Sequence, residues 1–154
     1  MIKYIYTFFL GLLLATFVGV GISTFYPSPK EPTMPDSYMR AIDSKELTAE
    51  QKQAEETYLS EQKTFQTTFS TYNRNVSLIA LVFSLVALVI ALGFAHTLPV
   101  ITDGLLLGGV FTLLYSIGRG LASEDPQFRF IVTTVGLIIA LVLGYLKFIR
   151  AKTE

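Results

Sequence analysis

Cysteine and tryptophan are absent from this chain of 154 residues, and histidine occurs once, at position 96. Without cysteine the protein has no disulfide, no thiol nucleophile and no thiolate metal site. A single histidine excludes a two-histidine metal or catalytic centre within one chain. We therefore expect neither a bound metal nor a cofactor.

An excess of charge of one sign is also lacking, because 12 basic residues balance 12 acidic ones. Nucleic-acid-binding domains usually carry a basic excess, so nucleic acid is not an expected partner. Common catalytic motifs are missing as well: the sequence contains no GxxxxGK[ST] phosphate loop and no HExxH zinc motif. No serine lies within a helical turn of His96 to form a nucleophile–base pair. We expect no enzymatic activity.

The sequence does contain long stretches without charge. No charged residue lies between Lys3 and Lys30, Arg74 and Asp103, Asp103 and Arg119, or Arg129 and Lys147. A helix needs about 20 mostly apolar residues to cross a hydrocarbon core of roughly 30 Å. Backbone groups in lipid must be paired within the protein, which favours helices over open strands. The sequence predicts an all-α fold, a four-helix transmembrane bundle.

The first apolar segment has a short basic start, as a cleaved signal peptide does. Its apolar run is longer than the usual h-region of about 7–15 residues, and no clean small-x-small site precedes Tyr26. We expect residues 1–26 to be a retained transmembrane helix.

A long polar helix is predicted between the first and second membrane helices. Prolines at positions 27, 29, 32 and 35 favour an extended linker over residues 27–45. Thr48-Ala49-Glu50-Gln51 has the form of a capping box, and neither glycine nor proline occurs from Glu46 to Leu92. We expect a polar amphipathic helix over 46–75 that projects about 40 Å from the membrane. Residues 76–150 then form a three-helix transmembrane region, and 151–154 a tail.

The polar helix carries an apolar stripe with spacings of four and three. Its candidate interaction seam consists of Tyr58, Phe65, Phe69 and Tyr72. Two interpretations are open: the stripe folds against its own chain or the lipid headgroups, or it binds a second copy or another partner.

Small residues recur four apart in the membrane segments, where they allow helices to approach closely. The candidate helix-packing residues are Gly11, Ala15, Gly19, Ser23, Gly104, Gly108, Thr112, Ser116, Gly136, Ala140 and Gly144. This pattern favours a compact bundle, with or without a second copy of the chain.

Asp103 and Arg119 are the candidate functional charges. They lie 16 residues apart, about 24 Å along a helix, which matches the two ends of one membrane span. The alternative is functional: Asp103 pairs with His96, or Arg119 with Glu124, along a water-filled path. The charges flanking the spans conflict on orientation, and the start of the first helix favours a cytoplasmic N-terminus with the polar helix outside.

The run TDGLLLGGVFTLLYSIGRG, with FRFIVTTVGLIIALVLGYLKF after it and TYNRNVSLIALV before it, resembles small uncharacterised multi-pass membrane proteins of bacterial candidate phyla. The resemblance covers about half of the chain. It implies a multi-pass protein of the bacterial inner membrane, and it implies no activity and no site residues.

These observations favour an integral membrane structural or interaction protein, either a subunit or a self-associating bundle that presents an amphipathic helix. Its expected partners are the lipid bilayer and either itself or another membrane protein. The alternative is a small oligomeric channel or carrier that uses Asp103 and Arg119.

Overall fold

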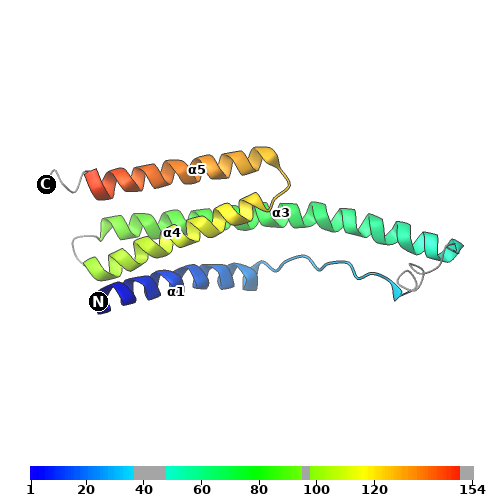
Figure 1. Cartoon of the computed structure of the whole chain (residues 1–154), viewed down its shortest axis with the longest axis horizontal. Coiled ribbons are helices and arrows are strands. Elements are labelled where there is room, and N and C mark those ends of the chain that lie inside the picture. The colour runs from blue at the N-terminus through cyan, green and yellow to red at the C-terminus, as the bar shows by residue number, and fades with distance from the viewer. Residues whose placement is uncertain (37–47, 95–97, 150–154) are drawn as a thin grey trace.

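The computed structural model describes residues 1–36, 48–94 and 98–149, and this part of the chain is all-α (Figure 1). The helices are α1 (Ile2–Phe25), α3 (Ala49–Gly93), α4 (Pro99–Leu121) and α5 (Pro126–Gly144), and a short π-helix, η1 (Tyr145–Ile149), continues α5. The predicted second half of the linker, the start of the polar helix at residue 46, His96 and the tail lie outside the described residues.

Helix α1 ends where proline begins to dominate the sequence. The backbone N–H of Tyr26 still donates to the Ile22 carbonyl at 2.7 Å, but Pro27 has no N–H and restricts the residue before it. From Pro27 to Pro35 the chain is extended, without helix or turn. Figure 1 shows this segment, named the strap here, running along the outer part of α3.

Helix α3 begins at the predicted capping box. The Thr48 hydroxyl accepts from the Gln51 N–H at 3.4 Å, and the Gln51 side chain accepts from the Thr48 N–H at 2.8 Å, so this prediction is confirmed. No glycine or proline follows before Gly93, and the helix therefore runs unbroken for 45 residues, about 67 Å. Its polar half (Ala49–Asn75) precedes an apolar half.

Helix α4 is the centre of the packing, because α1, α3 and α5 all contact it. It begins with Pro99 in its first turn, a position that proline tolerates. Helix α5 begins after Asp125, whose carboxylate accepts from the N–H groups of Gln127 and Phe128 at 3.0 and 3.2 Å. In Figure 1, α5 and α1 lie on opposite sides of the pair formed by α3 and α4.

A buried apolar cluster joins α1 to α3 near the end of α1. It consists of Val18, Ile22, Tyr72, Val76 and Ala80. Val76 and Ala80 are completely inaccessible, and they mark the point where α3 changes from polar to apolar sequence. The strap, α1 and both halves of α3 therefore meet at this level of the molecule.

All four long helices are apolar enough and long enough to cross a membrane. Most of their large apolar side chains point outward: Phe8, Phe17, Val89, Leu137 and Leu141 are examples of exposed ones. A protein surrounded by water would not leave such a continuous apolar surface open. A lipid environment solvates this surface and leaves the backbone paired within the helices.

Candidate functional site

Helices α1 and α4 come into close contact at two glycines, Gly11 and Gly108. A Cβ atom added to Gly11 would lie 3.1 Å from the backbone nitrogen of Gly108. A Cβ atom added to Gly108 would lie 2.8 Å from Leu14 Cβ and 3.1 Å from the Gly11 carbonyl oxygen. The two backbones thus touch directly, as small residues permit in membrane helices.

Other predicted packing residues also lie at contacts between helices. Gly104 faces Leu10 of α1, and Gly136 of α5 faces Ile117 of α4. Thr112 and Ser116 are buried on α4. By contrast, Cβ atoms added to Gly19 and Gly144 would meet nothing within 4 Å. Ser23 and Ala140 are exposed, and Ala15 is half-buried.

Helices α3 and α4 are joined by the hydroxyls of three buried serines. Ser77 Oγ donates to the Ser116 carbonyl at 2.8 Å, and Ser116 Oγ donates to the Ser77 carbonyl at 2.7 Å. Ser84 Oγ donates to the carbonyl of Gly109 at 2.8 Å. Each hydroxyl is fully buried, so these bonds satisfy groups that would otherwise be costly in lipid.

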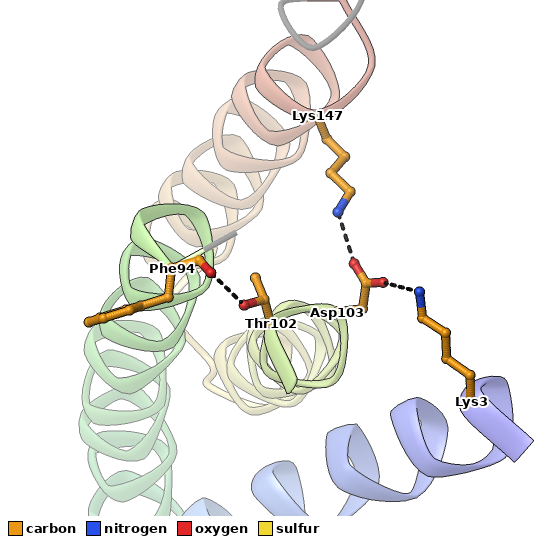
Figure 2. Close-up of polar contacts among 5 residues, drawn as sticks. All are labelled: Lys3, Phe94, Thr102, Asp103 and Lys147. Atoms are coloured by element: carbon orange, nitrogen blue, oxygen red, sulfur yellow. Dashed lines mark hydrogen bonds and ion pairs between the residues drawn. The ribbon is translucent and has the colours of Figure 1, made fainter. Parts of the chain in front are cut away.

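Asp103 lies in an ion cluster that joins three elements, which Figure 2 shows. Its Oδ1 atom is 2.9 Å from Lys147 Nζ of η1, and its Oδ2 atom is 4.0 Å from Lys3 Nζ of α1. Beside it, Thr102 Oγ1 donates to the Phe94 carbonyl at the end of α3 at 3.2 Å. The carboxylate therefore ties α4 to the first and last helical segments at one end of the molecule.

Arg119 lies near the other end of α4, among aromatic and amide groups. Its Nε donates to Tyr115 Oη at 3.1 Å, and one terminal nitrogen donates to Asn73 Oδ1 at 2.9 Å. The guanidinium carbon lies 5.7 Å from the Tyr72 ring centre and 5.5 Å from that of Tyr115. Both rings are within the range of a cation–π contact.

Of the two candidate pairs in the functional interpretation, only that of Arg119 with Glu124 falls on described residues. No ion pair joins these two side chains in the described part of the chain. The proposed pairing of Asp103 with His96 lies outside the described residues. Both candidate charges instead connect helices to one another.

Asn73 was not singled out by the sequence, and it is the most unusual polar residue of the interior. Its side chain is completely inaccessible. Its oxygen accepts from Arg119, whereas its Nδ2 has no hydrogen-bond partner among the described residues. The one sequence feature that could have drawn attention to Asn73 is its position on the predicted polar helix, directly before the charge-free run that starts after Arg74. The register that buries it against α4 is not visible in the sequence.

Three of the four residues of the predicted seam, Phe65, Phe69 and Tyr72, stack as a series along α3. Phe65 lies 5.4 Å from Phe69, and Phe69 lies 6.1 Å from Tyr72, measured between ring centres. Tyr26 then stacks on Tyr72 at 5.3 Å with the planes 12° apart. Tyr26 Oη also accepts from Asn75 Nδ2 at 2.9 Å. The seam thus leads directly to the end of α1 and the start of the strap.

Four apolar spans, of which α1, α3 and α5 pack around α4, define the class of this chain: it is a multi-pass α-helical membrane protein. Within the described ranges no three acidic or histidine side chains are grouped closely enough to hold a metal ion. No known protein family, curated protein or solved structure matches the chain.

Proposed function

We propose that this protein is a non-catalytic structural or interaction subunit of a membrane, which presents the polar half of α3 beyond the lipid to another copy of itself or to another membrane protein. The observation that carries the proposal is the unbroken course of α3. Its polar half continues without a break into an apolar span. One rigid helix therefore extends from the membrane part to the region beyond the lipid.

The surroundings of the charged residues support a structural role for the membrane part. Asp103 links α4 to Lys3 and Lys147, and Arg119 links α4 to Asn73 of α3. Each charge lies toward one end of its span, where it can reach the interface. Such contacts hold helices together and require no chemistry. The resemblance described above is what supports a bacterial inner membrane as the location.

Photocrosslinking tests this proposal. Benzoylphenylalanine placed at Tyr58 or Phe65 in native membranes should form a product with a second polypeptide, which mass spectrometry then identifies. The same group at the exposed Lys63 is the matched control, and it should form less of that product. A chain that runs only as an uncrosslinked monomer with both probes would contradict the proposal.

A small oligomeric channel or carrier is the second candidate, and one observation favours it. The buried Nδ2 of Asn73 lacks a partner beside a cationic guanidinium, a combination that a passing anion or water would satisfy. This candidate predicts ion or solute flux in liposomes that is lost on Asp103→Asn or Arg119→Gln. Unchanged flux in both variants, once folding is verified, would exclude a role for these charges.

A further inference from the structure

Three of the four prolines in the strap (Pro27–Pro35) are spaced three residues apart, namely Pro29, Pro32 and Pro35, and all three are half-buried. Of the residues between them, Lys30, Glu31 and Thr33 are exposed and Met34 is half-buried. A polyproline II helix has three residues per turn, so residues three apart share one face. One face of the strap, carrying these three prolines, is therefore directed toward the protein.

Helix α3 offers aromatic rings at a matching repeat. Tyr58, Phe65 and Tyr72 are spaced seven residues apart, which is about 10.5 Å along an α-helix. Three residues of polyproline II advance by about 9.3 Å. Since the two repeats are nearly equal, prolines of the strap can alternate with rings of α3 over two or three repeats.

The strap and α3 together line three successive grooves. They are formed by Pro27, Pro29 and Tyr72; by Pro29, Pro32 and Phe65; and by Pro35, Ala54 and Tyr58. The order shows that the strap leads away from α1 while α3 returns toward it. The eight steps from Pro27 to Pro35 cover about 25 Å as polyproline II, and the 14 steps from Tyr58 to Tyr72 cover about 21 Å of helix.

The fit between strap and helix is loose along its length and tight only at its root. The grooves keep volumes of about 460, 390 and 400 Å³, and the prolines have no N–H with which to bond α3. At the root, Tyr26 stacks on Tyr72 and accepts a hydrogen bond from Asn75. The strap can therefore lift from α3 while its start stays in place.

The grooves also carry charge that selects among proline-rich sequences. Glu61 lines the middle groove together with Lys30 of the strap. Glu50 and Glu61 both line the outermost groove. A carboxylate beside a proline site favours a ligand with a lysine or arginine next to its proline, as the strap itself has in Pro29-Lys30.

We propose that the polar half of α3 is a docking surface for polyproline II segments, which the chain's own strap occupies in cis. The partner is a protein with an extended segment that has prolines three residues apart and a basic residue beside one of them. Aromatic surfaces recognise such segments because their extended form is set before binding. The inference rests on the proposed function, since it names the partner class of the same surface and adds regulation by the strap.

The test uses the full chain in lipid nanodiscs and a fluorescein-labelled peptide with the sequence of residues 26–36. Replacing Pro29, Pro32 and Pro35 by serine in the chain should tighten peptide binding at least about tenfold, because a larger fraction of α3 is then open. Adding Phe65→Ala should reverse that gain, whereas Gln66→Ala, an exposed neighbour, should not. Equal affinity for the wild type and the serine variant, or no effect of Phe65→Ala, would overturn the proposal.

A second variant decides the question if the serine variant does not fold. Because the chain lacks cysteine, Pro32→Cys with Ser60→Cys, two positions on the middle groove, can be joined by a short bis-maleimide. A link within one chain that lowers peptide binding below that of the unlinked protein supports occupation in cis. A link formed mainly between two chains places the strap in trans and overturns it.

The two proposals fail in different ways. If the peptide binds as expected but photocrosslinking in native membranes traps no second polypeptide, the docking surface holds and the interaction role is wrong. If a second polypeptide is trapped at Tyr58 but the peptide is not bound by any variant, the interaction role holds and the polyproline II surface is wrong.

Discussion

Gly108 is the residue on which the contact between α1 and α4 depends most directly. It meets Leu14 and the backbone of Gly11, and it leaves no room for a side chain. In lipid the hydrophobic effect does not drive helices together, so van der Waals contact at such points provides much of the packing energy. The Lys3–Asp103 and Lys147–Asp103 pairs add less, because all three side chains are between 36% and 52% exposed and exposed pairs contribute about 0–1 kcal/mol.

Gly108→Leu should destabilise the protein by about 1–3 kcal/mol, the usual cost of overpacking. The expected result is a lower midpoint of thermal unfolding in detergent. Size-exclusion chromatography after heating measures the fraction of protein that remains folded. Gly118→Leu is the matched control on the same helix, since a Cβ atom there meets nothing within 4 Å. An equal loss of stability in both variants would show that the helix crossing is not the cause.

Small residues at a spacing of four were visible in the sequence, but their neighbours were not. Gly104 and Gly108 face α1, whereas Gly19 and Gly144 face no other part of the described chain. Gly109 was overlooked, yet an added Cβ would lie 2.7 Å from Leu88 of α3. The sequence shows which helix faces are lined by small residues. Which of these faces contacts another helix depends on the tertiary packing.

At the scale of elements, α3 was the most predictable part of the fold. Its capping box and the absence of glycine and proline are local features, and local features set where a helix begins and how far it continues. The spans were predictable for a similar reason, since the number of apolar residues needed follows from membrane thickness. The unbroken helix across the polar and apolar halves required no tertiary information.

The contacts of the strap and of η1 were not predictable in this way. The sequence predicted an extended segment, but not that its prolines would face Tyr58 and Phe65. Helix η1 is a π-helix, a rare form whose hydrogen bonds join residues five apart instead of four. It carries Lys147, whose Nζ lies 2.9 Å from Asp103. Both features are tertiary contacts between segments that are distant in the sequence. Local sequence patterns do not show which distant segments will be in contact.

At the scale of the whole molecule, four spans predict that the start of α1 and the start of α4 lie on one side of the membrane. They predict that the polar half of α3 and the α4–α5 connection lie on the other side. Lys3 and Lys147 gather at one end, around Asp103, whereas Arg74, Arg119 and Arg129 flank the spans at the other. We predict from the basic start of α1 that the end with Asp103 faces the cytoplasm.

Cysteine accessibility checks this arrangement without a background signal, since the chain has no cysteine of its own. Ser60→Cys and Glu124→Cys, both at exposed positions, should react with a membrane-impermeant maleimide added outside intact cells. Leu98→Cys, also exposed, should react only after the membrane is opened. Labelling of Ser60→Cys and Glu124→Cys from opposite sides would contradict four spans, and the reverse pattern for all three sites would invert the orientation.

The central position of α4 has a consequence for how the protein is made. Translation produces α1 and α3 before α4, yet Gly11 of α1 and Ser84 of α3 both find their partners on α4. Until α4 is made, the first two spans lack these partners, and the contacts between them are chiefly those of the cluster of Val18, Ile22, Val76 and Ala80. Completion of the third span is therefore the step of biosynthesis at which α1 and α3 gain their contacts with α4, and α5 adds its own contacts with α4 afterwards.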